Sequence, residues 1–144
     1  MVFSMIKMQW MTGDDDISDC HMLRKQIFTD EQGLIDEPDE FDAACMHLLI
    51  TDNNLPVGAA RIYRDKNIFH AGRICLIIPY RNNGIGRLIM NEIENKVRKS
   101  GAAAIELGAQ EAAEGFYLKL GYLSFGEPFY EQGCRHVLMR KELI

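Results

Sequence analysis

In seven short stretches of the chain, apolar residues either alternate with polar ones or run together. The clearest is "IFHAGRICLII" at 68–78, which is rich in branched and aromatic residues and meets Pro79, whose missing N–H ends strand pairing. "AAIELGA" at 103–109 has the character of a buried strand. The strands we expect are 3–10, 45–51, 57–65, 68–78, 103–109, 122–126 and 135–143.

Three other stretches carry apolar residues three and four positions apart, which is the spacing of one helix face. The first is 17–32, which Gly33 can terminate, and the third is 112–120, which ends at Gly121. The second follows Gly84, and its apolar face holds Ile85, Leu88, Ile89, Ile93 and Val97. Arg87, Asn91, Glu94 and Arg98 fall elsewhere on that helix.

The order of these elements predicts an α/β (α+β) domain, a mixed sheet with helices on its faces, spanning residues 1–144 as one unit. The strand–helix–strand segment at 68–109 predicts a right-handed parallel crossover. Ligands of such sheets bind beyond the carboxyl ends of the central strands. We therefore look for a site just after residue 78.

Charge is distributed unevenly along the chain, whose net charge is −5. Residues 11–42 contain eleven Asp or Glu against two Lys or Arg, and the rest contains ten against fourteen. The acidic stretch argues against nucleic acid as a partner, and it either attracts a cationic substrate or is a solvated face. Its densest part is the expected surface loop 33–44, with Asp36, Glu37, Asp39, Glu40 and Asp42.

The sequence contains no unbroken apolar segment long enough for a membrane helix and no signal-peptide pattern at its start. Its four cysteines are far apart, without a C-x-x-C pair, which argues against a zinc site and a disulfide scaffold. We therefore expect a cytoplasmic protein without a metal, in which Cys75 is a small core residue.

Between the strand 68–78 and the second helix lies "YRNNGIG", residues 80–86. A glycine-containing turn at this point leaves the first N–H groups of the helix unpaired, and the helix dipole favours an anion beside them. The stretch lacks the G-x-x-x-x-G-K-[ST] pattern of P-loops and the third glycine of dinucleotide folds. From these residues alone, an ordinary turn and an anion site both remain open.

Two motifs together carry a resemblance to a known family. "RNNGIG" resembles the R/Q-x-x-G-x-G/A pyrophosphate motif of the GNAT acetyltransferase superfamily, and "AAEGFYLKLGY" at 112–122 resembles that family's A-x-x-F-Y-x-K-x-G-F/Y segment. "FTDEQGLIDEPDEFDAACMHLLI", "GAQEAAEGFYLKLGY" and "YEQGCRHVLM" are similar to the ElaA-like subgroup. The resemblance covers nearly the whole chain. It implies a mostly antiparallel sheet of six to seven strands and an acetyl-CoA-dependent N-acetyltransferase.

The resemblance also implies roles for individual residues. Main-chain groups of Leu76, Ile77 and Ile78 would pair with the pantetheine arm of CoA, and an N–H there would polarise the thioester carbonyl. The positions expected to contact the rest of acetyl-CoA are Arg81, Asn82, Asn83, Gly84, Ile85, Gly86, Arg87, Gln110, Phe116, Tyr117 and Lys119.

Proton transfer needs two further groups. Tyr117 matches the family tyrosine that protonates the departing thiolate. Many family members place a glutamate base on the strand corresponding to 68–78, where this chain has no carboxylate. Glu31 and His47, which match the subgroup pattern, are our candidates for the base, and His70, Glu106 and His136 are further ones.

Two other functions fit the same sequence. One is a non-catalytic module that binds CoA or acyl-CoA, and the other is a phosphate- or nucleotide-binding protein that shares only the strand–loop–helix geometry. The acceptor, a small-molecule amine or a peptide, is not identified by the sequence. Exposed sheet edges leave a homodimer open.

Overall fold

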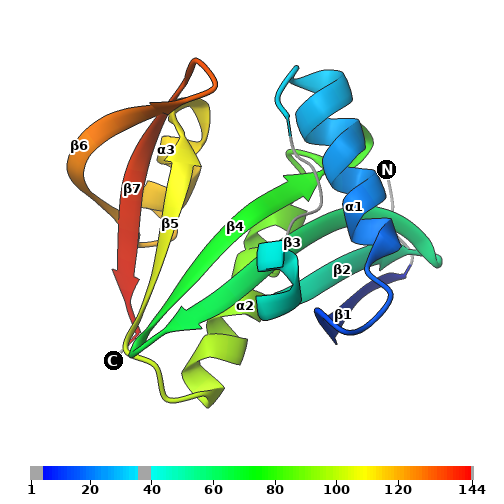
Figure 1. Ribbon diagram of the computed structural model, residues 1–144, viewed down its shortest axis with the longest axis horizontal. Coiled ribbons are helices and arrows are strands. Elements are labelled where there is room, and N and C mark those ends of the chain that lie inside the picture. Colours follow the sequence, from blue (N-terminus) through cyan, green and yellow to red (C-terminus); the bar gives the residue numbers. More distant parts are fainter. Residues whose placement is uncertain (1–4, 36–39, 144) are drawn as a thin grey trace.

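The computed structural model describes residues 5–35 and 40–143, in which one twisted sheet lies between helices (Figure 1). Its strands are β1 (Ile6–Thr12), β2 (Met46–Asp52), β3 (Leu55–Asp65), β4 (Ile68–Leu76), β5 (Ala104–Gln110), β6 (Leu123–Glu131) and β7 (Cys134–Glu142). Its α-helices are α1 (Ser18–Arg24), α2 (Ile85–Lys99) and α3 (Glu114–Lys119). Shorter helical segments are η1 (Lys25–Glu31), η2 (Glu40–Ala44), η3 (Ile78–Tyr80) and η4 (Glu111–Ala113).

The seven strands form one sheet in the order β1-β2-β3-β4-β5-β7-β6. Only β4 and β5 are parallel, and every other neighbouring pair is antiparallel. Tight hairpin turns account for the pairs β2–β3 and β6–β7, because Asn53 and Asn54, and Gln132 and Gly133, have the positive φ that such turns require. The fold class expected from the sequence is confirmed.

The parallel pair β4–β5 opens into a V. Only Ile68–Ala71 of β4 pair with Ala104–Leu107 of β5, and beyond them the two strands diverge (Figure 1). β4 also carries a bulge, where its register against β3 shifts between Ala59 and Arg61. Within the bulge, Arg73 has a φ of 51°. The divergence exposes main-chain edges of two central strands, at the place where the sequence predicts a ligand.

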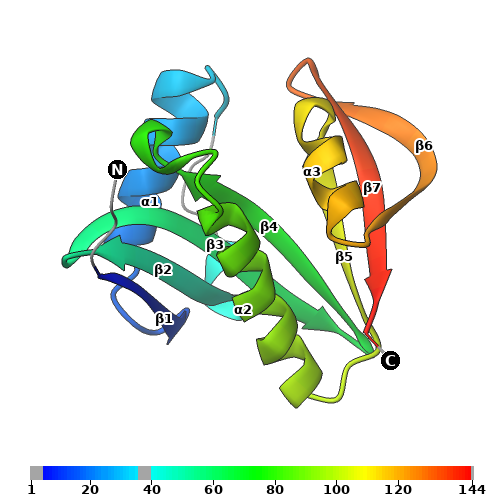
Figure 2. The same ribbon diagram turned by 180° about the vertical axis from the view of Figure 1, so that it is seen from behind.

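Helices cover the sheet on both faces (Figures 1 and 2). α2 packs one face through buried Ile89, Met90 and Ile93, whereas α1 packs the other through Cys20 and Leu23. Strand alternation supplies both cores, since Leu48 and Ile50 of β2 belong to the α2 side and Leu49 to the α1 side. Cys75 is buried on the α1 side, as expected.

Two expected elements differ in detail. The helix predicted at 17–32 continues as predicted, but from Lys25 it widens into the π-helix η1. Residues around Pro128 were expected to form a loop, whereas β6 runs through Pro128 to Glu131. The strand tolerates this proline because it lies at the edge of the sheet, where the register against β7 breaks between Phe125 and Phe129.

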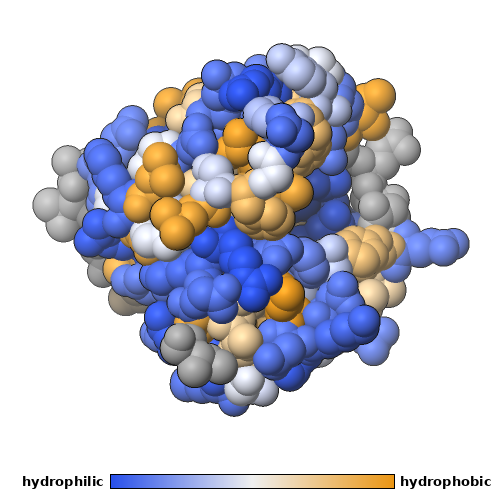
Figure 3. All heavy atoms as spheres, turned by 90° about the vertical axis from the view of Figure 1, so that its left-hand side faces the viewer, coloured by the Kyte–Doolittle hydropathy of each residue, from blue (hydrophilic) through white to orange (hydrophobic). Residues whose placement is uncertain are grey.

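The edge strand β6 is largely exposed (Figure 3). Its side chains Leu123 and Tyr130 are exposed. On the face that Figure 3 shows, apolar and polar side chains are interspersed. Single exposed apolar residues of this kind are normal at a protein surface. Among residues 5–35 and 40–143, no helix combines the length and the apolar character needed to cross a membrane.

A buried carboxylate connects the segment before β2 to the rest of the fold. Asp42 of η2 accepts hydrogen bonds from Arg24 of α1 at 2.9 Å and Arg61 of β3 at 2.8 Å, and contacts His21 at 3.1 Å. Burial by itself raises the pKa of Asp42, but the hydrogen bonds from the two guanidinium groups outweigh it and hold that pKa well below its usual range. Of the expected acidic loop, Asp36, Glu37 and Asp39 lie outside the described residues.

Candidate active site

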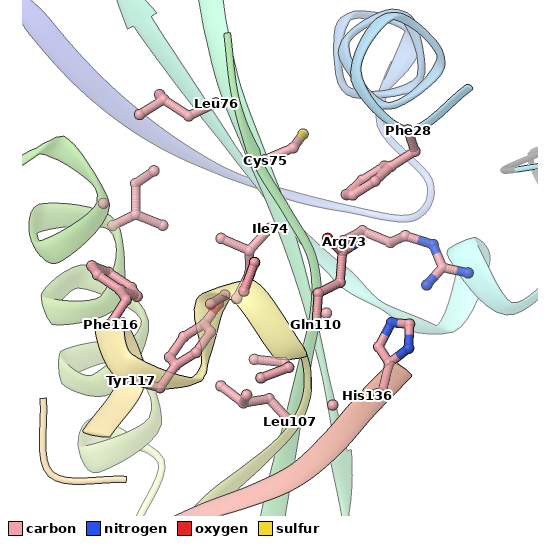
Figure 4. Close-up of a pocket in the computed structure, with 18 of the residues that line it drawn as sticks. Phe28, Arg73, Ile74, Cys75, Leu76, Leu107, Gln110, Phe116, Tyr117 and His136 are labelled. Carbon is pink, nitrogen blue, oxygen red and sulfur yellow. The ribbon is translucent and has the colours of Figure 1, made fainter. Parts of the chain in front are cut away.

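A cleft of about 1150 Å³ occupies the V between β4 and β5. Its walls come from both strands, the start of α2, α3, the end of η1, and the β6–β7 hairpin. Phe116 and Tyr117 lie on the side of α2 and α3, whereas Phe28, Arg73 and His136 lie together on the opposite side (Figure 4). The cleft therefore has two distinct halves.

The glycine loop forms the mouth of the α2 half. Gly84 is the residue before α2, with a φ of 84°, and among the residues that the structure describes no side chain caps the helix. The N–H groups of the first turn therefore have no capping partner, and the dipole of this 15-residue helix adds partial positive charge there. The cleft lining includes Asn82, Gly84, Gly86 and Arg87 from the expected set.

Two members of the expected loop set are turned differently. Ile85 is buried in the core, so only its main chain is available to a ligand. The amide of Asn83 donates to the carbonyl of Arg81 at 2.7 Å and thereby braces the turn. A Cβ on Gly86 would lie 3.2 Å from the Phe116 ring, so the gap between the loop and α3 is narrow.

Arg81 is held by other groups of the protein. Its Nε donates to the carbonyl of Leu76 at 2.7 Å, and its two terminal nitrogens donate to the Glu31 carboxylate at 2.8 Å each. These hydrogen bonds lower the pKa of Glu31. A carboxylate stabilised in this way is a weaker proton acceptor.

Two main-chain groups of the segment expected to pair with pantetheine, residues 76–78, already form hydrogen bonds within the protein. The Ile77 N–H donates to Val57 of β3 at 2.9 Å, and the Leu76 carbonyl is the acceptor for Arg81. Ile78 opens η3, and the first N–H groups of a helix have no partner within it. Of the three expected positions, only Leu76 belongs to the cleft lining. Because the Ile77 N–H bonds to β3, the N–H of the neighbouring Leu76 points away from β3, towards the open V.

Tyr117 of α3 lines the cleft with 8% of its surface exposed. Its ring contacts Phe116 and Tyr122 edge-on, and burial raises the pKa of its hydroxyl to about 12. Within the described part of the chain, no residue forms a hydrogen bond with this hydroxyl. Tyr117 thus carries a firmly held proton at the cleft wall. Lys119 lines the same cleft.

The expected base candidates have very different surroundings. His47 is 1% exposed, hydrogen-bonds the Asp42 carbonyl, and is absent from the cleft lining. Its pKa is lowered, chiefly by burial. Glu106 accepts a hydrogen bond from Arg140 at 2.7 Å. Only His70 and His136, of the three histidines proposed, line the cleft.

Side-chain amides connect the segment after η1 to β5 and to the β6–β7 turn on the other side of the cleft. Gln110, at the end of β5, donates to Gln32, just after η1, at 3.0 Å. Gln132, in the β6–β7 turn, accepts from the Ile35 N–H at 2.7 Å and donates to the Ile35 carbonyl at 3.0 Å. Gln110 was expected to contact a ligand, which stays a prediction, and in the structure its amide bonds Gln32.

Sequence reasoning missed Phe28 and Arg73 as cleft residues. Phe28 lies within the helix predicted at 17–32, in the part that forms the π-helix η1, and its side chain lines the cleft (Figure 4). Arg73 reaches the cleft from the bulge in β4, and its positive φ has no signature in the sequence. Gly72 beside it offered the only hint of an irregular strand.

Comparison with known proteins places this geometry in a class. The acetyltransferase (GNAT) domain family matches residues 29–143. A Bacillus subtilis (strain 168) protein provisionally named an acetyltransferase is 39% identical over 140 residues, 92% of this chain and 93% of that protein. The chain therefore belongs to the GNAT acetyltransferase family, a family of acyltransferases.

Solved structures agree on the fold. Escherichia coli ElaA has a TM-score of 0.86 at 24% identity, covering 96% of this chain and 100% of that one. A GNAT family acetyltransferase from Elizabethkingia anophelis with acetyl-CoA bound has a TM-score of 0.73 at 18% identity, covering 95% and 97%. The resemblance stated from the sequence is thus confirmed for family and fold.

Proposed function

We propose that this chain is an acetyl-CoA-dependent N-acetyltransferase whose acceptor is a primary amine of a small molecule or peptide. One observation carries the proposal: the uncapped start of α2 and the buried phenol of Tyr117 line the same cleft. An anion-binding helix terminus and a proton donor are what CoA-dependent transfer needs at the two ends of the pantetheine arm. The structural neighbour from Elizabethkingia anophelis, which has acetyl-CoA bound, supports this choice.

The residues present fit CoA. The open N–H groups after Gly84 suit a pyrophosphate, because main-chain donors and the helix dipole both favour negative charge. Arg87 adds a cation at the mouth, and Phe116 borders the narrow passage beside Gly86. When bound there, acetyl-CoA supplies an activated thioester.

The chain's own groups would then manage protons. Tyr117, with its pKa raised to about 12 by burial, keeps its proton at neutral pH and can donate it to a departing thiolate. The N–H of Leu76, whose residue lines the cleft, would polarise the thioester carbonyl. The acceptor half of the cleft lies across β4 and β5, beside Phe28 and Arg73 (Figure 4).

The test is thiol release from acetyl-CoA over a panel of amines, with the Tyr117→Phe variant beside the wild type. We expect the variant to lose about 100-fold or more in kcat, because its ring remains and only the proton donor is removed. Acetyl-CoA affinity, measured by calorimetry, should change little.

Tyr130→Phe is the matched control, since Tyr130 is 70% exposed on β6 and absent from the cleft lining. It should behave as wild type. Acetyl-CoA binding without turnover on any amine would instead support a non-catalytic CoA-binding module, and preferential binding of ATP would support a nucleotide-binding protein.

A further inference from the structure

We propose that His136 is the general base that takes the proton from the acceptor amine, with its Nε2 as the accepting atom. This inference rests on the proposed N-acetyltransferase function and assigns the residue that the reaction still needs. Four features of the described residues carry it: a fixed ring tautomer, a fixed ring plane, a position facing Tyr117 across the cleft, and the pairing or location of the competing groups.

The tautomer follows from one hydrogen bond. The Nδ1 atom of His136 lies 2.8 Å from the carbonyl oxygen of Cys134. A carbonyl oxygen can only accept, so Nδ1 must carry the proton. In the neutral ring, Nε2 is then left with a lone pair. A neutral imidazole nitrogen with a free lone pair is the form that a general base requires.

The ring is also held in orientation. It stacks on Phe129 of β6, with centroids 5.3 Å apart and an interplanar angle of 22°. His136 is 8% exposed, yet it belongs to the cleft lining. A ring packed on one face and bonded at Nδ1 can present only its remaining edge to the cleft.

Strand register places His136 opposite Tyr117. His136 of β7 pairs with Gln110 of β5. Side chains alternate along a strand, so Leu107 and Ala109 of β5 point to the opposite face from Gln110. On that opposite face they belong to the same core as Tyr117. Figure 4 shows Tyr117 and His136 on opposite sides of the cleft. An acceptor amine on the His136 side and a leaving thiolate on the Tyr117 side would each face the group that handles its proton.

The competing candidates are disfavoured by their contacts. Glu31 is bound by Arg81, and Glu106 is bound by Arg140. His47 does not line the cleft. His70 lines it, but in the segment where β4 still pairs with β5, at the closed end of the V.

The proton balance is simple. The acceptor arrives as an ammonium ion and gives one proton to Nε2, and the resulting amine nitrogen bonds to the acyl carbon as the C–S bond breaks. The nitrogen then loses its second proton to water, and His136 passes the first one to water as well. The sulfur gains a proton from Tyr117, whose hydroxyl takes one back from water. One proton in total is released to water for each acetyl group transferred.

The experiment compares wild type with His136→Asn, whose side-chain amide can still donate to the Cys134 carbonyl but has no atom in place of Nε2. On an amine that the wild type acetylates, we expect kcat/KM at neutral pH to fall about 100-fold or more, with unchanged acetyl-CoA affinity. The acidic limb of the wild-type pH–rate profile should disappear. The charged residues of the cleft lining on the strands nearest β7 are Arg73 of β4, Glu106 of β5 and Glu131 of β6, and Glu106 is paired with Arg140.

His70→Asn is the matched control, because His70 also lines the cleft and stacks on an aromatic ring, Tyr63. It should keep the acidic limb. If His136→Asn kept that limb and its rate while the wild type was active, the base assignment would fail and the proposed function would stand. If the wild type acetylated no amine, both would fail.

A second measurement does not depend on the folding of any variant. Nitrogen-15 NMR of the intact protein at neutral pH should show His136 protonated at Nδ1 and bare at Nε2. The opposite tautomer would overturn the assignment.

Discussion

At the scale of single residues, Gly84 shows how a site can depend on backbone conformation. Its φ of 84° is left-handed, and a Cβ built on it would meet nothing within 4 Å. A side chain at this position would therefore meet no steric clash. Its free-energy cost would come only from holding a non-glycine backbone in the left-handed conformation. We expect Gly84→Ala to lower the free energy of unfolding by about 1 kcal/mol, measured by urea denaturation.

The control is Gly84→Asn, because asparagine tolerates the left-handed region better than alanine does. The chain itself uses Asn53, Asn54 and Asn82 at positive φ. The asparagine variant should keep most of the stability that alanine loses. Equal losses for both substitutions would show that the left-handed conformation is not the cause.

At the scale of elements, the ion pair between Glu31 and Arg81 connects η1 to the segment after β4. Both side chains are about one-third exposed, so the pair should stabilise the fold by less than about 1 kcal/mol. If Glu31 serves only to hold Arg81, Glu31→Gln should reduce turnover far less than the roughly 100-fold expected when a general base is removed. Steady-state kinetics decide between the two roles.

Glu111→Gln provides the comparison for stability, since Glu111 pairs with Arg135 at 3.5 Å on the surface. The two variants should have similar melting temperatures. A large loss of turnover in Glu31→Gln but not in Glu111→Gln, which persists at saturating acetyl-CoA, would instead support the catalytic role that the sequence predicts for Glu31.

At the scale of the whole molecule, Asp42 should govern stability towards acid. Its folded-state pKa is depressed, so its contribution is present above the unfolded value near 4 and is lost as pH falls towards the folded one. Asp42→Asn should cost about 3 kcal/mol at neutral pH, because the substitution removes the charge that pairs with the buried guanidinium groups of Arg24 and Arg61. Thermal unfolding followed from pH 7 to pH 3 should also show a shallower decline for the variant.

The exposed Asp14 supplies the reference, and Asp14→Asn should leave both the stability at neutral pH and its acid dependence nearly unchanged. An Asp42→Asn variant with wild-type acid sensitivity would mean that other carboxylates control the transition.

The sequence predicted most elements because their signals are local. The apolar periods of 68–78 and 85–97, and the glycine turn between them, correspond to β4, α2 and the open helix start. Contacts between residues far apart in the sequence leave no local signal, and such contacts account for the features that the sequence did not predict. Glu94 was placed off the apolar face of its helix, yet it is 4% exposed because Tyr122 and Lys141 bond its carboxylate from distant parts of the chain.

The same distinction applies to the cleft. Gly84, Gly86 and Tyr117 could be assigned from adjacent residues and a family resemblance, and the structure lines the cleft with all three. The position of His136 in the cleft depends on the register of β7 against β5, and its ring tautomer depends on a hydrogen bond to a main-chain carbonyl. Neither can be read from the sequence around His136.

The amide contacts of Gln32 with Gln110, and of Gln132 with Ile35, have a consequence for ionic strength. Dissolved salt screens charged groups over about 3 Å at 1 M, which weakens an exposed ion pair such as Glu31 with Arg81. Hydrogen bonds between neutral amides carry no net charge to screen. At high salt concentration, the amide contacts of Gln32 and Gln132 across the cleft should therefore persist where the ion pair between Glu31 and Arg81, beside the glycine loop, is weakened.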